Sequence, residues 1–234
     1  MDKHVDINIE YLENKQIELA KKVVIPQGKD DYLLKSEDII FSLDVQYVGD
    51  QAYVAVDTMR GNGELLGIFG SLQTVNFPYI PQFFSFREAP VLLAAIAKVQ
   101  EKTNLNPDLL LIDGHGVAHP RRFGVACYVG VELQIPTIGC AKEPLMKYEG
   151  ELGNERGNFI SLFLDNEEVG RVQRTQNGIK PVFTSAGHLI SLETSCEVIL
   201  QFTPFYRISE PLRRADHAAR AYAKGESLAG LQIL

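Results

Sequence analysis

A run of four apolar residues at 109–112, followed by Asp113, limits the possible folds of this chain more than any other feature. Apolar segments with helical spacing precede it at about 88–102 and follow it at 123–134. A short apolar run between two helices is typical of a buried strand in an α/β sheet. The sequence therefore predicts that this strand brings the Asp113 carboxylate to one end of the sheet. The alternative is an ordinary helix N-cap.

Three further strands are predicted before this segment. Residues 39–48, 51–59 and 64–75 are rich in β-branched and aromatic residues, and short turns that contain glycine separate them. We expect them to form an antiparallel meander. Helices and strands alternate afterwards, which predicts a mixed α/β sheet with helices on both faces, a three-layer αβα fold in a single domain over 1–234.

The other elements are predicted from periodicity and turn residues. Residues 6–24 have the pattern of an amphipathic helix, and Ser85 with Glu88 fits a capping box for the helix at 88–102. The remaining expectations are a strand at 136–141, a loop at 143–157, a hairpin at 158–174 turned at Asp165-Asn166, a strand at 181–188, a helix capped by Ser191 and a last helix from near Pro211.

Composition excludes several classes of protein. The 234 residues are 45% hydrophobic and 23% charged, as in soluble globular domains, and no apolar run approaches the roughly 20 residues that span a membrane. The first residues are too polar for a signal peptide. Cys127, Cys140 and Cys196 are odd in number and widely spaced, so neither a disulfide framework nor a cysteine zinc site is indicated. We expect a cytoplasmic protein.

The net charge of −7 argues against a protein that coats nucleic acid nonspecifically. The charge is unevenly distributed, because the basic residues exceed the acidic ones after residue 170. Eight cations, Arg171, Arg174, Lys180, Arg207, Arg213, Arg214, Arg220 and Lys224, stand there against five acids, Glu193, Glu197, Glu210, Asp216 and Glu226.

Asp44 is the second carboxylate of interest, because it interrupts a strand of apolar residues. One interpretation is the solvent-facing side of an edge strand. If its strand instead lies beside the strand that ends at Asp113, the two carboxylates are on strands about 4.8 Å apart, close enough to share a divalent ion. Two such carboxylates are costly without a shared cation, and oxygen ligands suit Mg²⁺ or Mn²⁺. Glu88 and Asp216 are further candidate acids, although Glu88 alone fits a capping residue better.

Four cationic or imidazole groups follow Asp113 within nine residues. Bare backbone at Gly114 and Gly116 permits close approach, and His119, Arg121 and Arg122 are donors suited to anionic oxygens. Lys142 ends a predicted strand, where it is either solvated or near a phosphate.

The segment PYIP, which comprises Pro78, Tyr79, Ile80 and Pro81, is a stiff connection. Tyr79 either packs on the core or acts as a wedge between bases.

Together these motifs resemble those of the endonuclease V family of repair nucleases. The matching blocks are FSLDV, PYIPQFFSFREAP, LLIDGHGVAHPRRFGVA, PTIGCAK and TSAGH, in family order over nearly the whole chain. The resemblance implies an RNase H-like fold. It also implies Mg²⁺-dependent cleavage, with Mn²⁺ as a substitute, at the second phosphodiester bond 3′ to deoxyinosine, which leaves a 3′-hydroxyl and a 5′-phosphate.

The resemblance also assigns roles to residues. Asp44 and Asp113 match the metal ligands, Glu88 and Asp216 the neighbouring catalytic acids, and Lys142 the lysine near the scissile phosphate. It further matches Tyr79 to the wedge tyrosine and implies that the loop with Gly114 and Gly116 receives the flipped base. Together with the donors chosen from residue type, the predicted DNA contacts are Pro78, Tyr79, Ile80, Pro81, His119, Arg121 and Arg122.

Two departures from the family pattern affect these roles. Gln82 replaces the usual glycine after PYIP, and Cys127-Tyr128 replaces a Ser-His pair. The alternative functions are an inosine-specific endoribonuclease, a structure-selective nuclease such as a junction resolvase, and a silent lesion-binding protein. We expect a monomer that binds lesion-containing DNA, with inosine-containing RNA as a second possible partner and no membrane contact.

Overall fold

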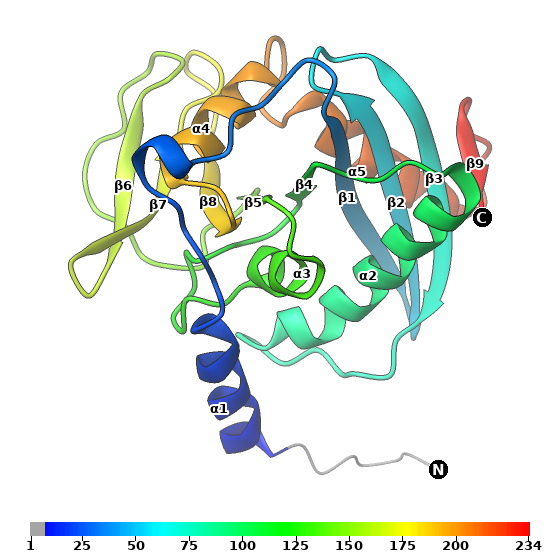
Figure 1. Ribbon diagram of the computed structural model, residues 1–234, viewed down its shortest axis with the longest axis horizontal. Helices are drawn as coiled ribbons and strands as arrows, with labels where there is room; N and C mark the ends of the chain where they lie inside the picture. Colours follow the sequence, from blue (N-terminus) through cyan, green and yellow to red (C-terminus); the bar gives the residue numbers. More distant parts are fainter. Residues whose placement is uncertain (1–7) are drawn as a thin grey trace.

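The computed structural model describes residues 8–234, and a nine-stranded sheet runs through it (Figure 1). The order of the strands is β6-β7-β8-β5-β4-β1-β2-β3-β9. In this part of the chain, no helix is long and apolar enough to cross a membrane.

The predicted meander is confirmed. It consists of β1 (Ile39–Val48), β2 (Gln51–Arg60) and β3 (Leu65–Thr74), which pair in antiparallel fashion. The β1–β2 turn contains Gly49 at φ 62°, a backbone conformation that glycine adopts without strain. In the β1–β2 register, Asp44 lies opposite Ala55, and this small neighbour leaves room above the sheet for a helix.

The second half of the sheet is mixed, as predicted. β4 (Leu109–Ile112) is parallel to both β1 and β5 (Thr137–Ala141), and β8 (Val182–His188) is antiparallel to β5. The predicted hairpin is β6 (Phe159–Leu164) and β7 (Glu167–Gln173), with both turn residues at positive φ. The short strand β9 (Leu231–Ile233) pairs with β3 and was not predicted.

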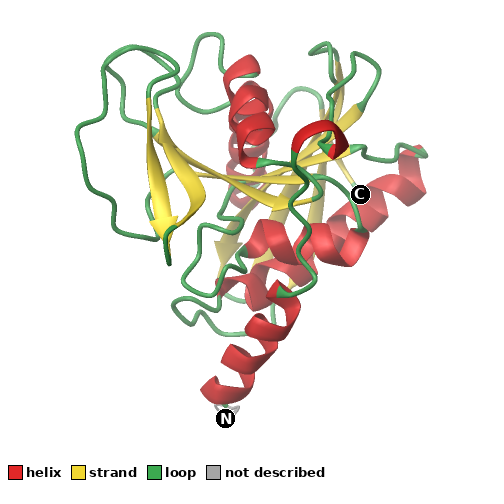
Figure 2. Cartoon of the chain, turned by 60° about the vertical axis from the view of Figure 1, so that its left-hand side comes forward, coloured by secondary structure: helices red, strands yellow, loops and turns green. Residues whose placement is uncertain are grey.

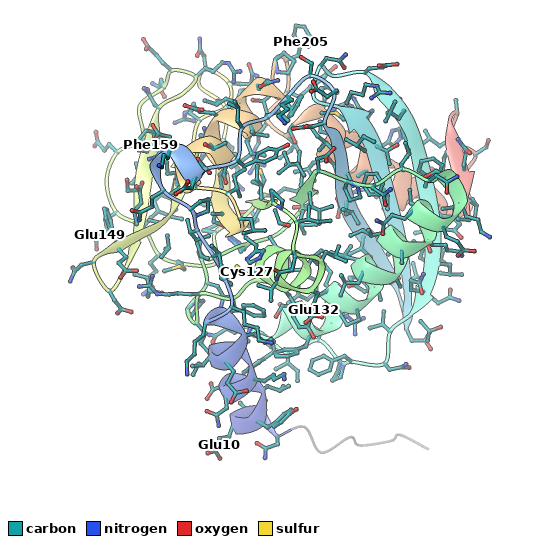
Figure 3. All side chains as sticks on the ribbon, in the orientation of Figure 1. Glu10, Cys127, Glu132, Glu149, Phe159 and Phe205 are labelled. Carbon is teal, nitrogen blue, oxygen red and sulfur yellow. The ribbon has the colours of Figure 1, made fainter. Side chains whose placement is uncertain are left out.

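Helices cover both faces of the sheet (Figure 2), so the three-layer prediction is confirmed. The helix α2 (Phe84–Thr103) and α3 (Val125–Leu133) pack on one face against the largest cluster of buried apolar side chains. The helix α4 (Leu192–Gln201) and the start of α5 (Glu210–Lys224) pack on the other. Side chains fill the space between the layers (Figure 3).

Two predicted helix starts are wrong. The N-terminal helix α1 spans Ile9–Ala20 rather than 6–24, and its N-cap Asn8 accepts a hydrogen bond from the Tyr11 amide (3.0 Å). Residues 6 and 7 of the prediction lie outside the described residues. α2 begins four residues before the predicted start, so the buried Ser85 and Glu88 lie inside it and form no capping box.

The other expected ends agree with the structure. The Ser191 side chain caps α4 by accepting from the Thr194 amide (3.1 Å), and α5 carries Pro211 in its first turn. Residues 143–157 form the expected irregular loop.

Candidate active site

Three aspartates from separate elements meet beside the sheet. Asp44 lies in β1, Asp113 directly follows β4, and Asp216 lies in α5. One carboxylate oxygen of each lies within 4.8 Å of the others. Because Leu43 pairs with Ile112 in the parallel β1–β4 ladder, Asp44 and Asp113 are neighbours, as the sequence predicted. The spacing of the strands did not predict the position of Asp216, which reaches the other two aspartates from α5.

The third aspartate reaches the sheet because α5 packs closely on it. Ala215, Ala218 and Ala219 of α5 are buried against Ala55 and Ile68, and side chains this small allow a close approach. A second contact fixes the start of the helix. The Arg214 guanidinium donates to both carboxylate oxygens of the fully buried Asp57 in β2, at 2.6 and 2.9 Å. Burial raises the pKa of Asp57 to about 6 despite this arginine.

The Lys142 ammonium lies between the three carboxylates. Lys142 directly follows β5, and its Nζ is 3.2 Å from Asp44 Oδ2 and 2.7 Å from Asp216 Oδ1, and it also pairs with Asp113. These negative charges raise the pKa of the lysine, although burial opposes them, so it is charged at neutral pH. Arg220, one turn after Asp216, pairs with that aspartate at 3.0 Å.

The acids of the site differ in their electrostatic surroundings: the hydrogen bond and charge of Lys142 and the contact with Arg220 lower the pKa of Asp216 despite its partial burial. Burial, followed by the charge of Asp113, raises the pKa of Asp44 well above its ordinary value. Glu88, from α2, is outside the group of three but is buried beside it, and its pKa is raised by burial and by both neighbouring aspartates. Oxygen ligands gathered in this way fit a hard divalent cation, which would offset the repulsion between them.

A cavity of about 340 Å³ opens beside these acids. Its wall includes Tyr79, Phe84, Gly114, His115 and Leu145. The His115 Nε2 contacts the Glu143 carbonyl oxygen (3.1 Å), whereas its buried Nδ1 has no hydrogen-bond partner among the described residues. Burial lowers the pKa of this imidazole to about 4, so the ring is neutral at pH 7.

The structure places Gly116, the second glycine predicted for the pocket, outside the wall of this cavity. Gly116 is buried away from the cavity wall, and its amide donates to Ser185 Oγ (2.8 Å). A Cβ at this position would lie 2.0 Å from the Ala186 carbonyl oxygen. The glycine is therefore required by the close approach of the loop to β8, and only Gly114 of the predicted pair lines the cavity.

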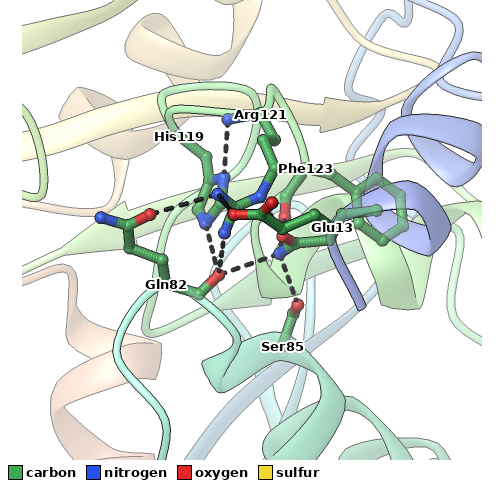
Figure 4. A network of polar contacts seen from close by, with 7 residues as sticks. Glu13, Gln82, Ser85, His119, Arg121 and Phe123 are labelled. Carbon is green, nitrogen blue, oxygen red and sulfur yellow. Dashed lines mark hydrogen bonds and ion pairs between the residues drawn. The ribbon is translucent and has the colours of Figure 1, made fainter. Parts of the chain in front are cut away.

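The segment with Tyr79 is presented outward, and its end is anchored. Tyr79 is 67% exposed, with its ring edge against Phe84 (centroids 5.8 Å apart). The anchor is Gln82, at φ 68°, whose carbonyl oxygen accepts hydrogen bonds from Gln16 Nε2 (3.0 Å), His119 Nε2 (3.0 Å) and Arg121 Nη2 (3.2 Å) (Figure 4).

His119 and Arg121, both predicted to contact DNA, form part of this anchor, and His119 also lines the cavity. His119 is 4% exposed, and burial lowers its pKa to about 4. The Arg121 guanidinium donates to Gln16 Oε1 (2.5 Å) and to Gln82 Oε1 (3.2 Å), and it pairs with Glu13. Both side chains use donors to hold the loop after Tyr79, and Arg121 also attaches this loop to α1 through Gln16 and Glu13.

Arg122 is also committed to protein contacts. Its guanidinium pairs with Glu167 (2.5 Å) and donates to the Leu164 carbonyl oxygen (2.9 Å), which attaches the loop to the β6–β7 hairpin. The departure at Cys127-Tyr128 lies in α3, where the Cys127 thiol is buried and the Tyr128 ring packs on Phe123. Neither residue lines the cavity.

Comparisons with known proteins agree with this geometry. The Endonuclease V family model matches residues 17–217. The chain belongs to the Endonuclease V family. Endonuclease V of Dictyoglomus thermophilum is 42% identical over 86% of this chain and 84% of its own length. The crystal structure of Endonuclease V from Streptomyces avermitilis superposes with a TM-score of 0.84, at 35% identity, over 96% of this chain and 97% of that one.

A third relative was solved with nucleic acid. Endonuclease V of Ciona intestinalis, in complex with a 24mer DNA containing an inosine followed by a ribo-adenosine, matches with a TM-score of 0.81 at 26% identity, over 93% of this chain and 98% of that one. The fold is therefore RNase H-like, and this member of the family is a nuclease, which hydrolyses its substrate.

Sequence reasoning missed some residues of the site. His115 contributes by lining the cavity, and Gln82 contributes through its backbone carbonyl oxygen. Residue type alone reveals neither role. The i, i+4 spacing of Asp216 and Arg220 in a predicted helix is a signal that would have found their ion pair.

Proposed function

We propose that the protein is a DNA repair endonuclease that recognises deoxyinosine and hydrolyses the second phosphodiester bond 3′ to it, leaving a 3′-hydroxyl and a 5′-phosphate. One observation carries the proposal: the three-aspartate cluster lies beside a cavity with a neutral imidazole and an exposed tyrosine at its wall. The complex of the Ciona relative with inosine-containing DNA supports the choice of lesion. We further propose that the chain acts as a single domain and a monomer.

Mg²⁺ is the proposed cofactor, with Mn²⁺ as a substitute. Asp44 and Asp113 would hold the ion, and Asp216 would complete the set of oxygen ligands. Such an ion stabilises negative charge on the phosphate and makes water easier to deprotonate. Glu88, whose pKa is raised by its surroundings, can hold a proton near the site. Lys142 provides a fixed positive charge beside the phosphate.

The lesion would be held by the pocket and the loop before it. Tyr79, between Pro78 and the Ile80-Pro81 pair, would fill the gap that the displaced base leaves, because a proline-stiffened loop holds its aromatic ring in place. The base would enter the cavity beside Gly114, where a glycine leaves the backbone accessible.

The proposal is tested by cleavage of a duplex with a single inosine, with the cut mapped in the presence and absence of Mg²⁺. We expect one cut at the second bond 3′ to inosine, only with metal. Asp113→Ala should abolish cleavage but retain binding to the inosine strand, because it removes a metal ligand and leaves the pocket. Full activity of that variant would refute the assignment.

An RNA substrate is a second candidate. The Ciona complex carries a ribonucleotide directly after the inosine, so that relative accommodates a 2′-hydroxyl next to the lesion. Matched DNA and RNA oligonucleotides, each with one inosine, would be compared by their kcat/KM. A higher value for RNA would assign the protein as an inosine-specific endoribonuclease.

A further inference from the structure

A hollow of about 450 Å³ lies outside the active site, between the segment before β8 and the segment before α5. Two aromatic side chains stand at its wall: Phe205 is 79% exposed and Tyr206 is 51% exposed. Figure 3 shows Phe205 at the edge of the molecule, pointing outward. Arg156, Ile179 and Arg207 also line the hollow. We call this group of five residues the aromatic–basic surface.

The arginines of this surface form no ion pair with an acid among the described residues, although Glu143 is close enough to Arg207 for the charge of the arginine to lower the pKa of that carboxyl. Arg156 donates to the carbonyl oxygens of Thr175 and Leu200, and Arg207 donates to that of Pro181. Arg174, which donates to the Gly153 carbonyl oxygen, adds a third cation nearby. These three arginines form no ion pair within residues 8–234. They therefore keep their full positive charge and account for part of the basic excess after residue 170.

The surface is continuous with the active site through Arg207. Its Nη2 donates to the Lys142 carbonyl oxygen and, at 2.8 Å, to that of Pro181. The same Lys142 places its ammonium between the three aspartates. Arg207 of the aromatic–basic surface is therefore in direct contact with the residue that carries the ammonium of the active site.

We propose that the aromatic–basic surface binds the part of the nucleic acid strand that flanks the scissile phosphate. Unpaired bases would stack on Phe205 and Tyr206. The arginines, whose hydrogen-bond donors are engaged by carbonyl oxygens, would attract the backbone phosphates by their charge rather than by direct hydrogen bonds. Exposed aromatic rings beside arginines are the combination that binds single-stranded nucleic acid with little sequence preference. One face of the Tyr206 ring is already covered by the Arg213 guanidinium (4.4 Å), which holds that ring in place. This inference rests on the proposed nuclease function.

The test compares Phe205→Ala and Tyr206→Ala with the matched control Phe163→Ala. Phe163 is 62% exposed on β6 and lies outside the surface. Binding is measured without divalent cation, on unmodified single strands and on inosine-containing strands of decreasing length. We expect roughly fivefold weaker binding or more for each of the two variants on long strands of both kinds. The control should bind as the wild type does.

Strand length supplies a second readout, because a purely structural role would weaken binding at every length. The loss of binding affinity should disappear once the strand is too short to reach the surface. With long substrates, the two substitutions should raise KM and leave kcat unchanged. Equal binding by the variants and the wild type on long strands would overturn the proposal, as would a loss that persists at the shortest length. A failure of the proposed function would give a different result, because the wild type would then bind inosine-containing and unmodified strands equally well.

Discussion

At the scale of single residues, Lys142 and a divalent cation compete for the same space. Its ammonium pairs with Asp44, Asp113 and Asp216, the same three carboxylates that would hold the ion. Because like charges repel at short range, we expect Lys142→Met to bind Mn²⁺ about tenfold more tightly at pH 8. The variant should nevertheless cleave more slowly, because it lacks the positive charge beside the phosphate. Calorimetric titration and single-turnover cleavage would measure the two effects.

Lys102→Met is the control for this variant, since Lys102 is an exposed lysine paired with Glu101 on α2. We expect its Mn²⁺ affinity to equal that of the wild type. If Lys142→Met bound Mn²⁺ more weakly than the wild type, Lys142 would be an aid to the metal site and not its competitor.

Tyr79 gives a second prediction at this scale. Its ring is exposed on a stiff loop, so Tyr79→Ala should weaken binding to an inosine strand by about tenfold, in line with roughly 1–3 kcal/mol for one aromatic–base stack. Mn²⁺ affinity should not change, because the ring contacts none of the aspartates. Tyr79→Phe should keep most of the affinity. Unchanged discrimination between inosine and adenine strands in Tyr79→Ala would remove the wedge role.

Residue types predicted the acids of the site better than its cations. Asp44 stood out because a carboxylate is unusual in an apolar strand. This is visible from the neighbouring residues in the sequence alone. Arg121 and Arg122 fit phosphate contacts equally well from sequence, but Gln16 and Glu167, their partners, are far away in the chain. An arginine is charged wherever it lies, so only the folded structure shows whether its donors are free.

At the scale of elements, the position of α5 decides whether Asp216 reaches the other carboxylates. Arg214, two residues before Asp216, is bound to the buried Asp57. Asp57→Asn leaves that guanidinium without its counterion, and breaking a buried pair costs about 3–5 kcal/mol. Because Arg214 is 24% exposed, we expect a smaller loss of about 2–3 kcal/mol in the free energy of unfolding.

Asp57→Asn should also lower Mn²⁺ affinity, since it loosens the helix that carries Asp216. Urea unfolding and metal titration of the same samples would measure both. Lys224→Ala, which removes only the exposed pair with Glu226 at the other end of α5, should change stability by less than about 0.5 kcal/mol. Lower stability with wild-type Mn²⁺ affinity would mean that Asp57 supports the fold but does not position Asp216.

Long periodic elements were predictable, whereas local end effects were not. The strands of the meander have ten residues each and were identified almost to the residue. The capping box failed because Ser85 is used elsewhere: its Oγ accepts from Gln16 Nε2 of α1 (3.4 Å), a contact made across the fold. β9 has three residues, too few for a pattern, and it exists because the edge of β3 is available to pair with it.

At the scale of the whole molecule, the sheet brings together residues that are distant in the chain. The three-layer architecture followed from the order of elements, whereas the pairing of β1 with β4 was one of two alternatives that the sequence left open for Asp44. The full strand order, with β8 antiparallel beside β5, did not follow. Strand pairing at long range depends on the packing of all layers together, which a local pattern does not contain.

Buried imidazoles that must stay neutral in the fold should contribute a loss of stability to the whole molecule in mild acid. The pKa of His119 is about 4 in the fold, below the ordinary value of 6.5, so the unfolded chain binds the extra proton first. The contribution of the neutral His119 imidazole to the free energy of unfolding is complete above pH 6.5 and is lost as the pH falls toward 4. Between pH 7.5 and 5.0 this single group should lower the free energy of unfolding by about 2 kcal/mol.

The comparison of wild type with His119→Gln isolates this effect. The raised pKa values of Asp44 and Glu88 act in the opposite direction, since those acids bind protons more readily in the fold, but they are common to both proteins. Urea unfolding in the presence of a chelator would measure the free energy of unfolding of both proteins at pH 7.5 and 5.0. The decrease between the two pH values should be about 2 kcal/mol smaller for the variant than for the wild type. Equal losses in the two proteins would mean that His119 does not carry this pH dependence, and that another group in the network around Gln82 takes up the proton.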